Sequence, residues 1–135
     1  KTGRYWDAVA DEVIRLASPT MHFRRTAIQD CELHGKKILK GDKVLLWFIS
    51  GSRDETVFKD PHTARLDRGA NRHLAFGQGG VHVCLGMHLA RLEVRIALEQ
   101  FIKRIDTVEA IGAPNLTRSN FICGVKKLNL RVKVL

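Results

Sequence analysis

Apolar residues in the first part of the chain recur with a helical period. Val9, Val13 and Leu16 follow one another at spacings of four and three residues, which predicts an amphipathic helix over residues 5–16. Pro19 comes shortly afterwards, and a proline disfavours helical geometry in the residue before it. We therefore expect the helix to end just ahead of this proline.

The next part of the chain carries two turn signals among residues that favour strands. His34-Gly35 separates two short runs between residues 26 and 38, which predicts a tight hairpin. Gly41-Asp42 marks a second turn, and residues 44–49 then form the longest apolar run. This run predicts a buried element, either a strand or a short helix, because periodicity cannot separate the two in so short a segment.

The stretch from Gly51 to Arg72 has a different composition. Asp, Arg, Gly and Pro dominate it, and its large apolar residues are Val57, Phe58 and Leu66. We expect an irregular polar meander that is anchored by these three side chains and held by side-chain contacts.

A long helix is predicted from about residue 85 to residue 105, directly after a glycine-rich loop. It carries two adjacent apolar stripes, one made of Leu85, Leu89, Leu92 and Ile96 and the other of Val94, Leu98, Phe101 and Ile105. So wide an apolar face predicts a helix that packs deep in its fold. Residues 128–134 alternate between apolar and polar and predict an edge or hairpin strand. The mixture of elements indicates an α+β fold.

Composition and charge narrow the possible functions. A chain of 135 residues is long enough for one domain, and 44% hydrophobic residues is an ordinary globular share. The net charge of +9 is compatible with an acidic partner such as nucleic acid, an anionic membrane or an acidic protein. Lys and Arg are dispersed and no nucleic-acid-binding motif accompanies them, so we expect no nucleic-acid partner. The apolar runs are too short to span a membrane.

The three cysteines, Cys31, Cys84 and Cys123, are odd in number and widely spaced. This pattern argues against a disulfide framework and favours a reducing cytoplasmic location. The sequence has no CxxC or CxxCH motif, so any metal chemistry would have to use a lone thiolate or histidines.

The segment from Phe76 to Gly86 carries the most chemistry. Its glycines allow the backbone to approach a flat ligand, and they deliver Cys84 to the start of the long helix, where the helix dipole favours a thiolate. Taken alone, the loop is also compatible with a buried structural cysteine, with a phosphate loop that lacks the usual motif, or with a nucleophile paired with a histidine. The histidines available for such a pair are His73, His82 and His88.

The full string resembles the haem-binding loop of the cytochrome P450 family, with one extra residue within Gly79-Gly80. Similar double-glycine loops occur in actinobacterial members that oxidise sterols and fatty-acid chains. The resemblance covers essentially the whole chain and implies the C-terminal third of that mainly helical fold. Residues 1–135 would then form a single haem-binding portion, with the N-terminal and central distal helices absent.

The resemblance also implies roles for individual residues. Cys84 would be the axial ligand of the iron of haem b, with Phe76, Gly77 and Gly86 around it. Haem propionates would be bound by Arg25, His73 and His82. Glu12 and Arg15 match the family's helical Glu-x-x-Arg, and Arg68 in the meander would complete a buried structural network with them. The weaker assignments to the substrate side are Thr20, Met21 and Phe121.

The implied activity is that of a haem-thiolate monooxygenase. It would hydroxylate a C–H bond of a lipophilic substrate, such as a sterol or a fatty-acid chain, using dioxygen and two electrons. The electrons would come from a ferredoxin-type partner on a basic proximal face that includes Arg91, Arg95 and Arg104. The family's distal Ala/Gly-Gly-x-x-Thr run is missing from this sequence, so we expect the chain to be inactive alone. The alternative is a haem- or partner-binding module without catalysis.

Overall fold

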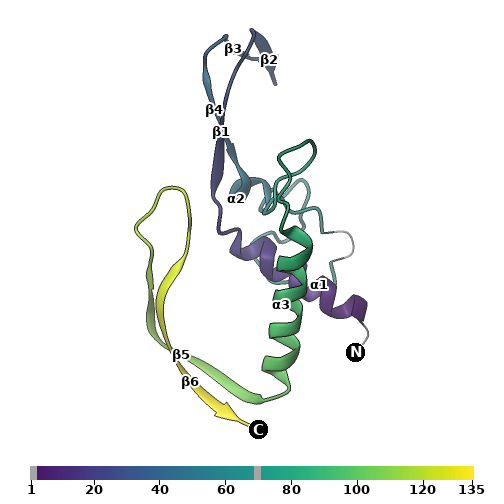
Figure 1. Ribbon diagram of the computed structural model, residues 1–135, viewed down its shortest axis with the longest axis vertical. Coiled ribbons are helices and arrows are strands. Elements are labelled where there is room, and N and C mark those ends of the chain that lie inside the picture. The colour runs from purple at the N-terminus through teal and green to yellow at the C-terminus, as the bar shows by residue number, and fades with distance from the viewer. Residues whose placement is uncertain (1–2, 69–70) are drawn as a thin grey trace.

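The computed structural model describes residues 3–68 and 71–135, in which two helices cross and β hairpins extend from them (Figure 1). The first helix, α1, spans Gly3–Ala17 and confirms the predicted amphipathic helix. Ser18 directly follows the helix. Its φ of 31° is left-handed, and its N–H donates to the Ile14 carbonyl. The Ser18 hydroxyl donates to the Arg15 carbonyl at 2.7 Å, so this buried helix end is satisfied.

Two antiparallel strand pairs follow α1 along the chain. β1 (His22–Thr26) pairs with β4 (Lys43–Trp47). β2 (Cys31–Leu33) pairs with β3 (Lys36–Ile38), at the end of the projection that β1 and β4 begin. The predicted hairpin turn is confirmed, because both His34 and Gly35 have positive φ angles, 49° and 74°. Such angles match the tight turn whose twist suits a two-residue hairpin.

The apolar run 44–49 contains both of the predicted kinds of element. Its first part belongs to β4 and its end to the short helix α2 (Phe48–Gly51). The predicted burial is wrong for most of it: Phe48 is buried, whereas Leu45, Leu46 and Trp47 are 40–47% exposed. Within the part of the chain that the structure describes, β4 pairs with β1 alone, and this two-stranded sheet leaves these residues exposed.

An irregular meander follows α2, as predicted, although Gly69 and Ala70 lie outside the described residues. Of the three expected anchors, only Phe58 is buried, at 3% exposure, whereas Val57 and Leu66 are exposed. Phe58 is covered by charge, because the Arg15 and Arg68 guanidinium groups lie 5.0 and 5.8 Å from its ring centre. The meander is therefore held mainly by polar contacts.

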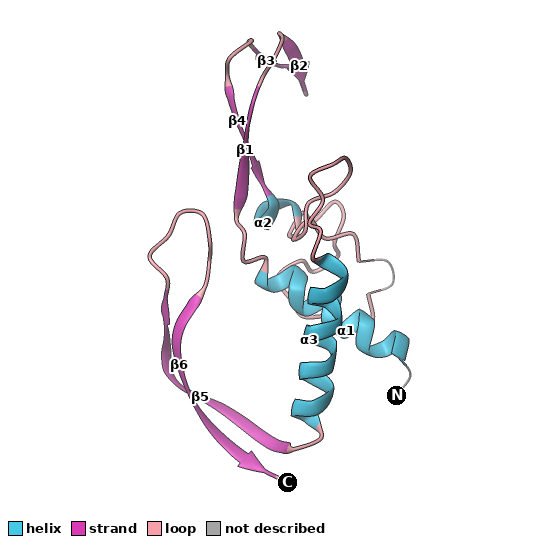
Figure 2. Ribbon diagram, in the orientation of Figure 1, coloured by secondary structure: helices cyan, strands magenta, loops and turns pink. Residues whose placement is uncertain are grey.

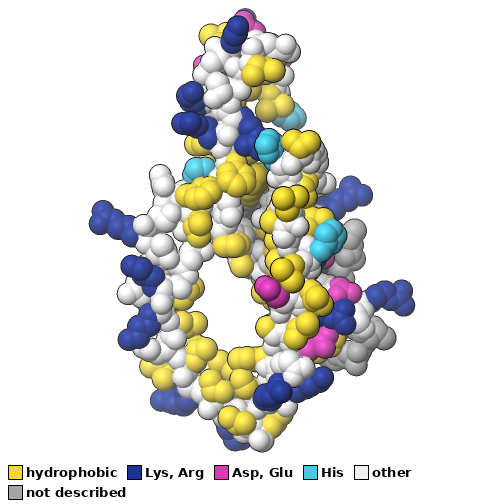
Figure 3. All heavy atoms as spheres, viewed as in Figure 1, with side chains coloured by type: hydrophobic (Ala, Val, Ile, Leu, Met, Phe, Trp, Pro, Cys, Tyr) yellow, Lys and Arg dark blue, Asp and Glu magenta, His cyan; other side chains and the backbone are white. Residues whose placement is uncertain are grey.

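The long helix, α3, spans Met87–Ile102 and packs against α1 (Figure 2). It is shorter at both ends than the sequence predicts: Gly86 caps its start, and Ile105 already opens a strand beyond its end. The predicted deep burial is wrong within this chain: no described residue of α3 is buried, and Leu89 is 59% exposed. The apolar stripes have too few partners among the described residues, and hydrophobic side chains stay visible along the helix in Figure 3.

The chain ends in a hairpin of β5 (Ile105–Leu116) and β6 (Val125–Val134), which confirms the predicted C-terminal strand. An open gap separates most of this hairpin from the helices (Figure 3). Its tip returns to the start of β1, where the Met21 N–H donates to the Phe121 carbonyl at 2.9 Å and Cys123 N–H donates to the Pro19 carbonyl at 2.7 Å. A bridge between Thr20 and Ile122 lies between these bonds.

The centre of the fold lies around α1, where polar and apolar side chains are buried together. The buried apolar residues are Val9, Ala10, Ile14, Phe48 and Phe58, and the buried polar ones are Glu12, Arg15, Ser18, Ser52 and His73. Among the described residues, no helix combines the length and the hydropathy needed to cross a membrane.

Candidate functional site

The loop before α3 has a conformation that depends on its glycines. Gly77, Gly79 and Gly80 have φ angles of 72°, 70° and 72°, in the left-handed region that other residues rarely occupy. The loop is closed by a bond from the Cys84 N–H to the Phe76 carbonyl at 3.0 Å. Cys84 is thereby fixed at the point where the loop returns to α3.

Cys84 lies beside the N-terminus of α3. The Met87 N–H donates to the Cys84 carbonyl at 3.3 Å, so the cysteine directly precedes the first turn of α3. The N-terminus of a helix carries partial positive charge, which stabilises a thiolate. A Cβ atom added to Gly86 would lie 3.9 Å from the Cys84 Sγ, so any side chain there would contact the sulfur.

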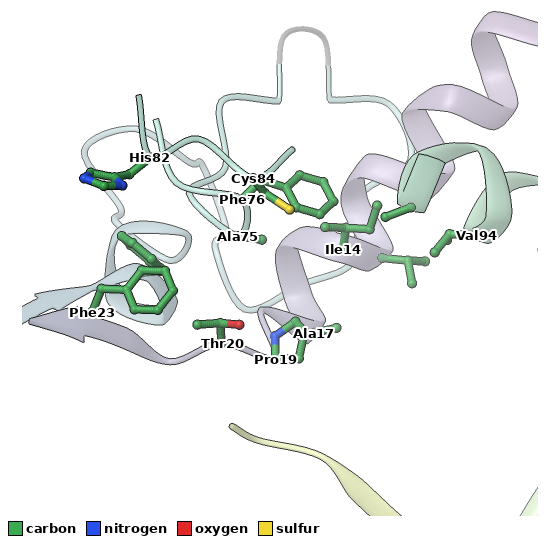
Figure 4. Close-up of a pocket in the computed structure, with 13 residues that line it drawn as sticks. Ile14, Ala17, Pro19, Thr20, Phe23, Ala75, Phe76, His82, Cys84 and Val94 are labelled. Atoms are coloured by element: carbon green, nitrogen blue, oxygen red, sulfur yellow. The ribbon is translucent and has the colours of Figure 1, made fainter. Parts of the chain in front are cut away.

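Cys84 lines a cavity of about 500 Å³ whose walls come from several segments (Figure 4). α1 contributes Val13, Ile14 and Ala17, the segment into β1 contributes Pro19, Thr20 and Phe23, and α2 contributes Phe48. The loop and α3 supply Ala75, Phe76, His82, Cys84, Ala90 and Val94. The walls are therefore mainly apolar and carry one sulfur. This combination fits a flat apolar group with a thiolate-binding metal, as in haem.

Two of the predicted propionate-binding residues, His82 and Arg25, differ in their relation to this cavity. His82 lines it and is exposed, and Figure 4 shows it away from Cys84. Arg25 follows Phe23 by two residues on β1, so both side chains point to the same face of the strand. The Arg25 guanidinium lies 6.0 Å from the Phe23 ring centre and forms no ion pair within the described residues. Both side chains are exposed, but of the two only His82 is among the residues that line the cavity.

His73 does not join them. It is buried and lies outside the set that lines the Cys84 cavity. Its Nε2 lies 3.3 Å from Asp11 Oδ1, and its Nδ1 accepts the Ala75 N–H at 3.3 Å. Because both ring nitrogens have protein partners, the predicted propionate contact of His73 has no support in this geometry.

The predicted network of Glu12, Arg15 and Arg68 is brought together. Arg15 donates to both carboxylate oxygens of Glu12 at 2.8 Å, and Arg68 Nε donates to Glu12 Oε1 at 2.9 Å. Glu12 and Arg15 are 1% and 0% exposed. A bidentate pair buried this fully needs each of its remaining donors and acceptors satisfied.

The remaining partners of the network were not predicted from the sequence. The Arg65 backbone N–H and the Asn71 side chain donate to Glu12 at 2.8 and 3.0 Å. Arg15 also donates to the carbonyls of Ser52 and Pro61 at 2.8 and 2.7 Å. Most of these contacts use backbone atoms, which carry no side-chain pattern. Asn71 does contribute a side-chain donor, but its position in the sequence does not predict a contact with Glu12.

Charge in this network changes the acidity of Glu12. Burial alone would raise its pKa, but hydrogen bonds from Arg15, the Arg65 backbone and Arg68 lower the pKa from 4.5 to about 2. Glu12 is therefore ionised at neutral pH, and its charge is matched by the arginines around it.

The substrate-side predictions divide between two cavities. Thr20 lines the Cys84 cavity, whereas Met21 is absent from its lining and Phe121 lines a second cavity with His22 and Trp47. Phe23 lines both cavities, so the two adjoin at β1.

The proposed basic face is partly neutralised within the chain. Arg91 pairs with Asp11 at 2.6 Å, and Arg95 pairs with Asp7 at 3.1 Å and with Glu99 at 2.9 Å. Arg104 lies beyond the end of α3 and donates to Gln100. The prediction that all three arginines lie on the long helix is wrong for Arg104.

A glycine-rich cysteine loop, an apolar cavity and a buried Glu-Arg network are thus combined in one chain. The family model described as cytochrome P450 matches residues 4–131. The chain belongs to the cytochrome P450 family. It is 48% identical over 118 residues to the methyl-branched lipid omega-hydroxylase of Mycobacterium tuberculosis H37Rv, a match that covers 87% of this P450 chain and 28% of the relative. Linalool 8-monooxygenase of Pseudomonas putida is 44% identical over 119 residues, which are 88% of this chain and 29% of the relative.

Solved structures confirm the fold. The P450 CYP108D1 from Novosphingobium aromaticivorans matches with a TM-score of 0.89 and 42% identity, covering 98% of this chain and 32% of that one. A thermophilic P450 from Sulfolobus tokodaii matches with a TM-score of 0.88 and 38% identity, covering 96% of this chain and 35% of that one. The predicted α+β part of the P450 fold is therefore confirmed. The P450 chain spans about 28% of the length of the first curated relative.

Proposed function

We propose that this chain is the haem-thiolate part of a bacterial monooxygenase, in which Cys84 would bind the haem iron. The observation that carries the proposal is the Cys84 sulfur, which lies at the start of α3 against a mainly apolar cavity. Bound haem would supply the oxidising chemistry that inserts oxygen into a C–H bond. The residues of this chain would bind and orient the haem and balance its charge.

The residues around Cys84 have separable tasks in this proposal. Phe76 and Gly77 begin the loop, Phe76 borders the cavity, and Gly86 keeps the space beside the sulfur free of a side chain. Arg25 and His82 would receive the two haem carboxylates, since both are exposed, His82 lines the cavity and Arg25 lies against Phe23, which also lines it. Glu12, Arg15 and Arg68 would hold the meander in place behind the loop.

We infer a lipophilic substrate, such as a sterol or a fatty-acid chain. Two relatives support this class: the methyl-branched lipid omega-hydroxylase and the steroid C26-monooxygenase of Mycolicibacterium smegmatis, the latter 38% identical over 120 residues. Thr20 and Phe23 are the wall residues that continue from the cavity into β1, and they are the positions at which this chain would contact such a substrate.

We also propose a ferredoxin-type electron donor with an acidic surface and a cytoplasmic location. The net charge of +9 supports an acidic partner. Arg104 donates to the neutral side chain of Gln100 and forms no ion pair with a carboxylate of α3 among the described residues. Cys31, Cys84 and Cys123 are all free thiols, which is in keeping with a reducing compartment.

Haem titration of the purified chain tests the proposal. We expect haem uptake and, after reduction under carbon monoxide, the red-shifted Soret band of thiolate ligation. Cys84→Ser should abolish this band, whereas Cys31→Ser and Cys123→Ser, which remove other exposed thiols, should retain it. Retention of the band in Cys84→Ser would refute the assignment.

A second measurement separates catalysis from binding alone. The apolar face of α3 is exposed, which favours a non-catalytic haem- or partner-binding module as the second candidate. We expect hydroxylation of a fatty acid only after the chain is combined with the part of a relative that it does not span. Haem uptake without turnover in that mixture would favour the binding module.

A further inference from the structure

We propose that Asp11, His73 and Arg91 form a positioning cluster, centred on Asp11, that holds the start of the Cys84 loop against α1 and α3. This inference rests on the proposed function only in taking Cys84 as the cofactor ligand. None of the three residues lines the Cys84 cavity, so the cluster would act through the loop and not by contact with a ligand there.

The carboxylate of Asp11 joins two segments that are far apart in the sequence. Its Oδ1 accepts a hydrogen bond from Arg91 Nε at 2.6 Å and lies 3.3 Å from His73 Nε2. Since the Ala75 N–H donates to His73 Nδ1, that nitrogen carries no proton, and the ring proton must lie on Nε2. The His73 ring therefore links Asp11 to the backbone that leads into the loop.

The cluster reaches Cys84 through Phe76. The Phe76 ring centre lies 5.2 Å from the Arg91 guanidinium and 5.6 Å from the His73 ring, so both members of the cluster pack on it. The Phe76 carbonyl accepts the Cys84 N–H at 3.0 Å. Any movement of Phe76 would therefore be transmitted directly to the cysteine backbone.

A neighbouring ion pair shows what is particular to Asp11. Asp7 also links α1 to α3, through Arg95 at 3.1 Å, but its side chain is 59% exposed and, among the described residues, neither member of the pair bonds to the loop. The Asp11 side chain is 25% exposed. Burial raises the pKa of Asp11, but the hydrogen bonds from His73 and Arg91 outweigh this effect and lower it, which keeps the carboxylate charged. The two aspartates thus form a matched pair for experiment.

The test compares Asp11→Asn with Asp7→Asn in the 135-residue chain by amide hydrogen exchange. Loss of a charge-assisted bond should open the loop about tenfold more often, so the amides of Ala75 and Cys84 should exchange about tenfold faster in Asp11→Asn. Asp7→Asn should leave them within about twofold of the parent, and Asp11→Glu should restore much of the protection. Equal exchange in the two asparagine variants would overturn the proposal.

A second readout follows the sulfur itself. In a background with Cys31→Ser and Cys123→Ser, the alkylation rate of Cys84 should change in Asp11→Asn and stay unchanged in Asp7→Asn. If Asp11→Asn loses helix content by circular dichroism, the same comparison is made between Arg91→Gln and Arg95→Gln. Neither readout requires haem, so failure of haem uptake would refute the proposed function and leave this test intact.

Discussion

At the scale of single residues, the best-satisfied group is the Glu12 carboxylate. It accepts hydrogen bonds from Arg15, Arg65, Arg68 and Asn71. The spacing of Glu12 and Arg15 and the resemblance to a known family were enough to predict its arginine partners. The Arg65 backbone and the Asp11 cluster were not predictable, because backbone donors and contacts across three segments leave no local pattern in a sequence.

Removal of the Glu12 charge should be costly. Glu12→Gln would leave Arg15 and Arg68 without their buried counter-charge, and loss of one partner of such a pair costs about 3–5 kcal/mol. Urea unfolding followed by circular dichroism measures the loss. Glu109→Gln is the control, because its ion pair with Arg131 is exposed and should contribute less than about 1 kcal/mol. Equal losses in the two variants would contradict the role of the network.

The same carboxylate predicts an acid-dependent loss of stability. The folded-state pKa of Glu12, about 2, lies below its ordinary value of 4.5. A lowered pKa stabilises the fold above the unfolded value, and this contribution is lost as pH falls through the folded value. About 3 kcal/mol should therefore disappear between pH about 4.5 and about 2. Urea midpoints across this range measure it, and Glu12→Gln should flatten the curve. An unchanged slope in that variant would assign the loss to other groups.

At the scale of elements, local sequence signals predicted well which helices, strands and turns are present, but they predicted poorly which of their side chains are buried. The helix stop at Ser18, the turn at His34-Gly35 and the final hairpin follow from turn chemistry and periodicity, which act over a few residues. Burial depends on what packs against an element. The stripes of α3 and the apolar part of β4 stay exposed because the described residues offer them few neighbours.

One contact between elements allows a test of packing. A Cβ atom on Gly51, at the end of α2, would lie 2.5 Å from Leu74 Cδ1, which precedes the cysteine loop. Gly51→Ala should therefore force the Leu74 side chain to move, at a cost of no more than about 1 kcal/mol, because Cδ1 is the end of a flexible side chain. In a double-mutant cycle measured by thermal unfolding, Leu74→Ala should remove this extra cost, since it clears the space. Additive effects of the two substitutions would show that the contact is not strained.

At the scale of the whole molecule, the surface exposes large apolar side chains of the kind that usually fill a protein core. Leu92 and Ile96 are 49% and 48% exposed on α3, and apolar side chains also line the β5–β6 hairpin beside the gap in Figure 3. Contiguous exposed apolar surface usually marks an interaction site. The family resemblance was enough to predict the fold. The chain spans only about 28% of the M. tuberculosis relative, however, and local sequence patterns cannot show which parts of its apolar surface are covered.

This exposure predicts how surface substitutions behave. Leu92→Gln with Ile96→Gln should change the free energy of unfolding by less than about 1 kcal/mol, because neither side chain is buried. The same double variant should lower self-association of the chain, as measured by sedimentation velocity. Val9→Gln, at a position 6% exposed, is the contrasting control and should destabilise the chain by more than 2 kcal/mol. A large loss in the α3 variant would show that this face is covered in solution.

The mixed centre around α1 also has a thermal consequence. Exposure of apolar surface raises the heat capacity of a chain on unfolding, whereas exposure of polar surface lowers it. Here Glu12, Arg15 and Ser52 are buried as fully as the apolar residues beside them. The two contributions therefore partly cancel, and the stability of this chain should vary with temperature along an unusually flat curve, with a broad melting transition and little loss on cooling.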